Sequence, residues 1–168
     1  IDLGEVARVF VVAFGKAARP MAAAVLPLLE GCRVQGLVVP PAPDLAPLPP
    51  FEVIAGGHPL PDAGSLHAAE RALALLGNAG EQDLVLFLVS GGGSALFERP
   101  IDPRLSLDDQ RQLHRLLVGS GADIVAMNTV RKHLSGVKGG RLAVRAGHSR
   151  QLTLYVSDVP PQHPEMVA

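Results

Sequence analysis

Residues 84–95, LVLFLVSGGGSA, decide how the rest of the chain is expected to fold. Residues 84–89 are apolar without alternation, which is typical of a strand buried on both faces of a sheet. This strand runs into Ser90, Gly91, Gly92, Gly93 and Ser94. The three glycines permit positive φ values and let a ligand approach the backbone. Unpaired N–H groups in such a turn, at the start of a helix, favour phosphate or carboxylate. With two serine hydroxyls expected at its rim, the loop is predicted to bind a small anion.

The glycine loop matches neither of the two common phosphate-binding fingerprints. Leu96 stands where the dinucleotide pattern G-x-G-x-x-G requires its third glycine, and no lysine follows the glycines as the P-loop requires. Glycine-rich turns after strands also occur as plain chain reversals. The residues therefore indicate an anion-binding loop and leave the identity of the anion open.

The composition is that of a single globular domain. The chain has 168 residues, of which 48% are hydrophobic and 18% charged, enough to bury one sizeable core. A net charge of −1 argues against a nucleic-acid partner. No apolar run approaches the roughly 18 residues of a membrane span. A single cysteine, Cys32, fits a reducing compartment, so we expect a cytoplasmic protein without a membrane partner.

Further strands and helices are expected on both sides of this central strand. Apolar runs predict strands over 9–14, 34–39, 51–55 and 151–156, and the proline-rich residues 40–50 predict a stiff connection. Helices are expected over 21–29, from the N-cap Asp62 to residue 76, after the N-cap Ser106, and over 122–134. In the third of these, Leu113, Leu116 and Leu117 form the expected apolar stripe. The pattern predicts an α/β fold with a mostly parallel sheet and helices on both faces.

Two polar residues follow expected strands and are candidates for ligand contact. Lys16 lies in the turn after strand 9–14, where its ammonium can reach a phosphate as a point charge. A solvated surface lysine is an equally good interpretation. His58 follows strand 51–55, at the end of the sheet where ligands of open α/β folds gather. A lone histidine is more often structural, and that interpretation is preferred for His58.

A basic segment follows in the second half of the chain. Its polar residues, first at the i, i+3, i+4 and i+7 spacing of one helix face and then in a glycine-rich turn, are Asn128, Arg131, Lys132, Ser135, Lys138 and Arg141. So many basic groups in a chain of balanced charge indicate an anion site. A solvated helix face is the alternative.

The sequence offers little sign of a metal site or a hydrolase nucleophile. The histidines and Cys32 show no metal-ligand spacing, and no G-x-S-x-G elbow is present. Asp158, after the last expected strand, could hold Mg²⁺ or orient a hydroxyl, and could equally cap a turn.

Five segments, in this order and spacing, resemble the glycerate 2-kinase family of the two-domain type, to which the name hydroxypyruvate reductase is also given. They are GKAARPMA (15–22), GGHPLPDAG (56–64), DLVLFLVSGGGSALFERP (83–100), SGADIVAMNTVRKHLSGVKGGRLA (120–143) and SDVP (157–160). The resemblance covers nearly the whole chain, and its NTVRKHLSGVKGGRLA block is highly specific.

The resemblance implies phosphoryl transfer from ATP, with Mg²⁺, to a hydroxyl of D-glycerate, giving 2-phosphoglycerate. It assigns residues 1–168 to a Rossmann-like domain whose cleft against a second domain, absent from this chain, is the active site. It leaves homo-oligomer formation open. These residues alone are therefore expected not to turn over glycerate. The resemblance places catalytic roles on Lys16 and Asp158. Substrate or phosphate binding falls on Ser90, Gly91, Gly92, Gly93, Ser94, Asn128, Arg131, Lys132, Lys138 and Arg141.

The chain departs from the family pattern at two places. Ala13 stands where the family usually has glycine, which is a mild change. Pro161-Gln162 replace the Gly-Asp that usually follows the SDV motif, which weakens the case for an acidic metal site there.

Two other functions are kept as alternatives. The first is an NAD(P)H-dependent hydroxypyruvate reductase, against which the missing G-x-G-x-x-G and its acidic ribose partner count. The second is a non-catalytic module that binds sugar phosphates.

Overall fold

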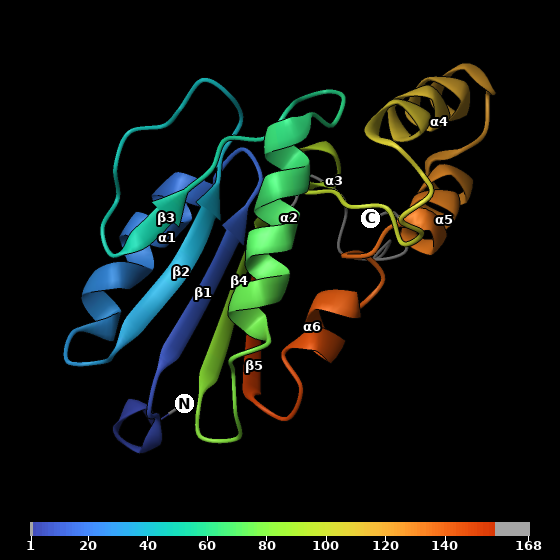
Figure 1. The fold of residues 1–168 in the computed structure, drawn as a ribbon. Helices are drawn as coiled ribbons and strands as arrows, with labels where there is room; N and C mark the ends of the chain where they lie inside the picture. The colour runs from blue at the N-terminus through green and yellow to red at the C-terminus, as the bar shows by residue number, and fades with distance from the viewer. Residues whose placement is uncertain (1, 157–168) are drawn as a thin grey trace.

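The computed structural model describes residues 2–156, which form a five-stranded sheet in the order β3-β2-β1-β4-β5 (Figure 1). The strands are β1 (Val9–Phe14), β2 (Val34–Val39), β3 (Phe51–Val53), β4 (Leu84–Ser90) and β5 (Arg150–Val156). Every neighbouring pair is parallel. The predicted α/β fold is confirmed.

Helices connect these strands, and two cores fill the space between helices and sheet. The helical elements are η1 (Leu3–Glu5), α1 (Ala18–Val25), η2 (Leu26–Leu29), α2 (Ala63–Leu76), α3 (Gly93–Leu96), α4 (Leu107–Gly119), α5 (Ile124–Leu134) and α6 (Arg141–Arg145). Because successive strand side chains point to opposite faces, Phe10 and Val12 pack with residues of α2, α3 and α6, whereas Val9 and Val11 pack with α1 and η2. Helices cover both faces of the sheet, as predicted (Figure 1).

Most element boundaries follow the sequence prediction, and the exceptions have local causes. Strands β1 and β2 have the predicted bounds, but β3 ends at Val53 instead of residue 55. The helix expected over 21–29 starts at Ala18 and changes to the 3₁₀ turn η2, which has a proline in its first turn. Helix α5 starts at Ile124 because Asp123 caps it, accepting a hydrogen bond from the Ala126 N–H at 2.8 Å.

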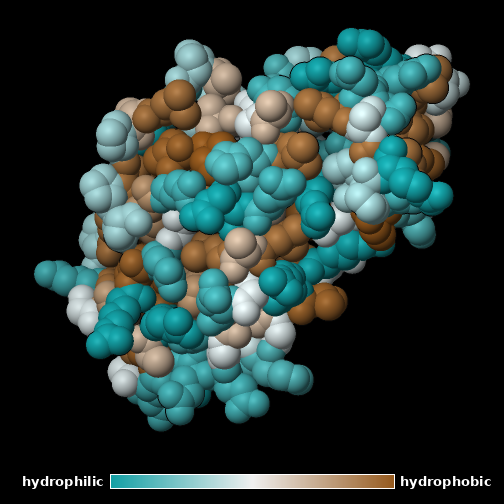
Figure 2. All heavy atoms as spheres, in the orientation of Figure 1, coloured by the Kyte–Doolittle hydropathy of each residue, from teal (hydrophilic) through white to brown (hydrophobic). Residues whose placement is uncertain are grey.

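The predicted apolar stripe of α4 is only partly buried, with Leu113 and Leu117 half-buried. This helix buries Gln110 and His114, whereas the side chain of Leu116 is 63% exposed. Helices α4 and α5 lie beside the sheet instead of on it (Figure 1), so the leucine row meets neither core. Hydrophobic residues reach the surface at the outer edge of this helical pair (Figure 2).

The strand order positions the candidate site. From β1 the chain adds β2 and then β3 on one side of the sheet. It then crosses to the other side of β1 and adds β4 and β5, so the direction in which strands are added reverses between β1 and β4. In open α/β sheets a ligand crevice forms at such a switch point, beyond the carboxyl ends of the strands. The register pairs Phe14 with Val89, which brings the turn after β1 beside the glycine loop after β4. None of the helices described is long and apolar enough to cross a membrane.

Candidate anion-binding site

The turn after β1 and the glycine loop after β4 are joined into one unit. The backbone N–H of Lys16 donates to the carbonyl of Gly91 at 2.8 Å, and that of Ala17 donates to Oγ of Ser90 at 2.9 Å. Gly15 makes this approach possible: its φ is +113°, and a Cβ atom there would collide with the backbone and side chain of Ser90. The structure therefore brings Lys16 and the glycine loop together.

Ser90 lies beneath the loop and not at its rim, which corrects the sequence expectation. The residue is 5% exposed and its hydroxyl accepts the Ala17 N–H. As the last residue of β4 it points into the contact between the two strand ends. Its observed contribution is to fix the turn that carries Lys16, and its binding role stays a prediction.

Gly91 is the exposed residue of the loop, whereas Gly92 and Ser94 are half-buried and Gly93 is buried. Gly92 has a φ of +86° and precedes α3, whose first N–H groups have no partner within the helix. A Cβ atom at Gly93 would lie 2.7 Å from Cδ2 of Phe14, so a larger residue there would have to displace the Phe14 ring. The buried Oγ of Ser94 has no hydrogen-bond partner among the residues described. Lys16 is exposed, and its Cγ lies 3.3 Å from a Cβ position at Gly92. The Lys16 side chain therefore lies against Gly92, and the buried hydroxyl of Ser94 belongs to the same short loop. Ammonium groups, backbone amides and hydroxyls are donors that suit a carboxylate or phosphate.

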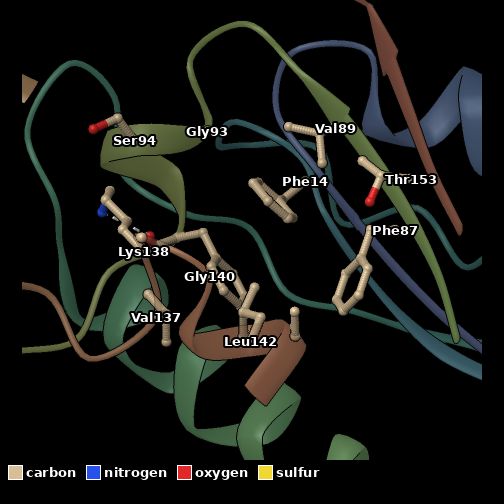
Figure 3. Close-up of a pocket in the computed structure, with 13 residues that line it drawn as sticks. Phe14, Phe87, Val89, Gly93, Ser94, Val137, Lys138, Gly140, Leu142 and Thr153 are labelled. Atoms are coloured by element: carbon tan, nitrogen blue, oxygen red, sulfur yellow. Dashed lines mark hydrogen bonds between the residues drawn. The ribbon is translucent and has the colours of Figure 1, made fainter. Parts of the chain in front are cut away.

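A cavity of about 210 Å³ adjoins the loop and links it to the Lys-Gly-Gly segment (Figure 3). Gly93 and Ser94 line it on one side, and Lys138, Gly139 and Gly140 line it on another. Its remaining lining is mostly apolar: Phe14, Phe87, Val89, Phe97, Val137, Leu142, Ala143 and Thr153. The rings of Phe14 and Phe97 stack with centroids 4.9 Å apart.

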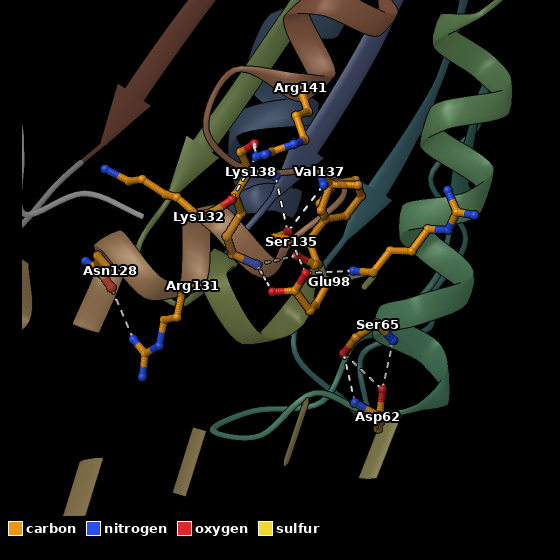
Figure 4. A network of polar contacts seen from close by, with 12 residues as sticks. Asp62, Ser65, Glu98, Asn128, Arg131, Lys132, Ser135, Val137, Lys138 and Arg141 are labelled. Carbon is orange, nitrogen blue, oxygen red and sulfur yellow. Dashed lines mark hydrogen bonds and ion pairs between the residues drawn. The ribbon is translucent and has the colours of Figure 1, made fainter. Parts of the chain in front are cut away.

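The ammonium of Lys138 is buried in an ion pair with Glu98 (Figure 4). Its Nζ also donates to the carbonyl of Phe97 at 3.3 Å, and Oγ of Ser135 donates to the other oxygen of Glu98 at 2.5 Å. Burial lowers the pKa of Lys138 below its ordinary value, and the neighbouring carboxylate opposes that shift. The pair holds the Lys-Gly-Gly turn against the end of α3. Anion binding by Lys138 itself stays a prediction.

The residues predicted to form one basic face on α5 do not act together: Arg131 bonds Asn128, and Lys132 extends in another direction. Nη1 of Arg131 donates to Oδ1 of the buried Asn128 at 3.2 Å, while its buried Nε has no partner among the residues described. Burial lowers the pKa of Arg131, and Glu98 opposes that shift. The Lys132 side chain extends away from the Glu98–Lys138 pair (Figure 4). Ser135 lies past the helix end in extended backbone, so it does not share the face as expected.

Arg141 braces the turn between α5 and α6. Its Nη1 donates to the carbonyl of Lys132 at 2.7 Å and to that of Lys138 at 3.0 Å. These two hydrogen bonds use one nitrogen of the guanidinium. They connect the backbone at Lys132 to the backbone at Lys138.

The predicted site residues thus fall into two groups. Lys16 lies with the glycine loop, and Lys138 lines the cavity beside it. Within residues 2–156, no hydrogen bond or ion pair joins Lys16 to Asn128, Arg131 or Lys132. Asp158 lies outside the described residues. No three His, Cys, Asp or Glu side chains of the described part of the chain are grouped as metal ligands.

His58, for which the structural interpretation was preferred, lies at the candidate site. A Cβ atom at Gly92 would lie 3.3 Å from Cδ2 of His58 and 3.4 Å from its Nε2. The imidazole therefore lies against the glycine loop, beside Lys16. Its place shortly after an expected strand was the available signal, but one histidine without a partner in the sequence gave no reason to prefer a binding role.

Comparison with known proteins gives one family and several relatives. Residues 1–168 match a family model described as "Domain of unknown function (DUF4147)". The chain is 44% identical over 153 residues to "D-glycerate 2-kinase" of Thermotoga maritima, covering 90% of this chain and 36% of that protein. It is 43% identical over 161 residues to "Glycerate 2-kinase" of Pyrococcus horikoshii, covering 96% and 36%. A protein of Agrobacterium vitis that is named for hydroxypyruvate reductase is 42% identical over 161 residues, covering 96% and 36%.

A solved structure shares the fold. The crystal structure of a glycerate kinase from Thermotoga maritima superposes with a TM-score of 0.85 at 44% identity, covering 92% of this chain and 37% of that one. The chain spans about a third of the length of the curated relatives it matches.

Proposed function

The chain belongs to the DUF4147 family, and from this premise we propose that it forms the nucleotide- and substrate-binding part of a glycerate kinase. The proposed reaction transfers the γ-phosphoryl group of ATP to D-glycerate and gives 2-phosphoglycerate. Relatives in Thermotoga maritima and Pyrococcus horikoshii carry the name of this activity.

The observation that carries the proposal is the joining of Lys16 to the glycine loop at the switch point of the sheet. Phosphoryl transfer depends on positioning and on neutralising charge more than on covalent groups of the protein. The exposed ammonium of Lys16 supplies charge, and the amides of Gly92 to Ser94 supply fixed donors for a carboxylate or phosphate. The unpartnered hydroxyl of Ser94 is a further donor.

The proposal includes ATP and Mg²⁺. The described residues offer donors for an anionic group of ATP but no group of side chains for Mg²⁺. One anionic group of a nucleotide or of glycerate fits the donors around Gly92. Mg²⁺ prefers carboxylate, phosphate and water oxygens, and residues 2–156 contain no group of three acidic, His or Cys side chains able to hold a metal. No step of the proposed reaction is therefore assigned to the metal.

The domain assignment is part of the same proposal. We assign residues 1–168 to a Rossmann-like domain and place the active site in a cleft that a second domain closes. The strand order and the position of the loop at the carboxyl edge support this assignment. Activity is accordingly tested on the full-length protein that contains these residues.

Coupled ADP release tests the proposed function, with D-glycerate, hydroxypyruvate and erythronate as acceptors. We expect ADP release with D-glycerate, and a fall in kcat/KM of about 10²- to 10³-fold in Lys16→Ala, because one preorganised charge is lost from the transition state. Arg71→Ala is the matched control, since Arg71 pairs with Glu52 at 2.8 Å on the surface of α2. A wild-type protein that releases no ADP with any acceptor contradicts the proposal.

The reductase alternative is tested in parallel by following NADH oxidation with hydroxypyruvate. We expect none, because Leu96 occupies the place of the third glycine of the dinucleotide fingerprint. A non-catalytic module would bind ligand through Lys16 but would consume no ATP.

A further inference from the structure

Three segments that are distant in the sequence meet at Gly92. A Cβ atom there would lie 3.3 Å from Cγ of Lys16, which follows β1, and 3.4 Å from Nε2 of His58, which follows β3. Gly92 itself belongs to the loop after β4. The imidazole and the ammonium-bearing side chain thus flank the same glycine of the proposed anion site.

The turn that carries His58 is held by hydrogen bonds from the backbone N–H groups of the two glycines that precede it. The N–H of Gly57 donates to Oδ1 of Asp62 at 2.9 Å and to Oγ of Ser65 at 3.0 Å. The N–H of Gly56 donates to the carbonyl of Pro40 at 3.0 Å, and a Cβ atom at Gly56 would collide with the carbonyl of Leu96. These contacts fix the backbone next to His58 and leave its two ring nitrogens unused.

The side chain of His58 is exposed and makes no hydrogen bond or ion pair within the described residues. It borders an open groove of about 790 Å³ between its turn and α4, to which Arg111 and Arg115 also contribute. A histidine kept for structure is expected to be buried or to bond protein groups with its nitrogens. Among the described residues His58 does neither, although hydrogen bonds hold the backbone just before it.

We propose that His58 is a catalytic residue of this site: its Nε2 accepts the proton of the acceptor hydroxyl during phosphoryl transfer. The inference rests on the proposed function. A 2-hydroxy acid whose carboxylate binds the amides of Gly92 to Ser94 carries its hydroxyl on the adjacent carbon, and Nε2 of His58 lies against the first of these glycines. Imidazole is suited to proton exchange near neutral pH.

The hydroxyl oxygen of the acid forms a bond to the γ-phosphorus, and its proton passes to Nε2 of His58. The bond between the γ-phosphorus and the bridging oxygen breaks, and its electron pair stays on ADP. Lys16 neutralises charge on the anion beside the loop, and His58 then returns the proton to solvent.

The test compares His58→Ala and His58→Gln in the full-length protein with wild type in the ADP-release assay. Base catalysis contributes about 10²- to 10⁴-fold, so we expect kcat to fall by that factor in both variants. We expect KM for glycerate and for ATP to stay within about threefold, because a proton acceptor acts in the transition state. Imidazole added to the buffer is expected to restore activity to His58→Ala and not to Lys16→Ala.

His67→Ala, on the exposed side of α2, is the control and is expected to retain wild-type kcat. The inference is overturned if His58→Ala keeps wild-type kcat, or if His58→Gln restores it, since glutamine can hydrogen-bond but cannot take the proton. It is also overturned if only KM rises. A wild-type protein without kinase activity contradicts the proposed function instead, so the two failures are distinguishable.

Discussion

Lys138 and Glu98 are separated by 40 residues in the sequence and form an ion pair that water hardly reaches. The carboxylate also accepts hydrogen bonds from the Ser135 hydroxyl and the Arg99 N–H. In such a setting the loss of one partner leaves an uncompensated buried charge, which is far more costly than the loss of a surface pair.

We therefore predict that Lys138→Met lowers the free energy of unfolding by about 3–5 kcal/mol. The double variant Glu98→Leu with Lys138→Met is expected to recover most of that loss, because both buried charges are then removed. Urea unfolding measures both effects. A single variant as stable as wild type would show that the pair does not hold the turn.

His114 gives a prediction for the pH dependence of stability. Burial, followed by the charges of Arg131 and Lys138, lowers its pKa from 6.5 to about 4. Between these values the unfolded chain binds the proton and the folded chain does not, so the stability contributed by neutral His114 is lost as the pH falls from 6.5 toward 4. We expect His114→Gln to flatten this part of the curve, measured by chemical unfolding at several pH values. His67→Gln, at an exposed position, should leave the slope unchanged, and an unaltered slope in His114→Gln would contradict the assignment.

At the scale of single elements, both α2 and α4 start with a capping box, but only the cap of α2 also bonds a residue outside its own helix. In α2, Asp62 accepts the Ser65 N–H at 2.9 Å and also the Gly57 N–H at 2.9 Å, so the cap fixes the turn that carries His58. In α4, Ser106 and Asp109 bond only within the exposed helix start. The first cap therefore stabilises both a helix and a part of the candidate site.

From this difference we predict that Asp62→Ala lowers the free energy of unfolding by about 1–2 kcal/mol, whereas Ser106→Ala lowers it by about 1 kcal/mol or less. The reason is that Asp62 satisfies a donor outside its own helix. Thermal or urea unfolding of both variants provides the comparison. Equal losses would indicate that the bond to Gly57 adds nothing.

At the scale of the whole molecule, the two cores against the sheet contrast with the α4–α5 pair beside it (Figure 1). All six residues of β1 belong to or adjoin these cores, whereas α4 buries only Gln110 and His114. Regions with few buried apolar contacts open at a lower free energy than the core strands.

We expect amide hydrogen exchange to be slowest in β1 and β4 and distinctly faster in α4, by orders of magnitude in rate. Mass spectrometry of exchanged peptides resolves the two regions. Exchange in α4 as slow as in β1 would contradict the described packing, and ligand binding that slows exchange around residues 56–62 and 90–94 would support the site.

The sequence by itself determined the strands, the caps and the edge of the sheet at which the site lies. Apolar runs predict β1, β2 and β4, and the N-cap residues Asp62 and Ser106 predict the starts of α2 and α4. Both kinds of pattern can be recognised because they depend on only a few neighbouring residues. A parallel arrangement then places Lys16 and the glycine loop at one edge.

Only the tertiary structure decided which side chains meet. It paired Lys138 with Glu98, buried Ser90 under the turn of Lys16, turned the polar side of α4 inward and set His58 against Gly92. Such contacts join residues that are far apart in the chain, and they produce no periodic pattern in the sequence. They depend on how complete elements pack, which no local pattern of residues encodes.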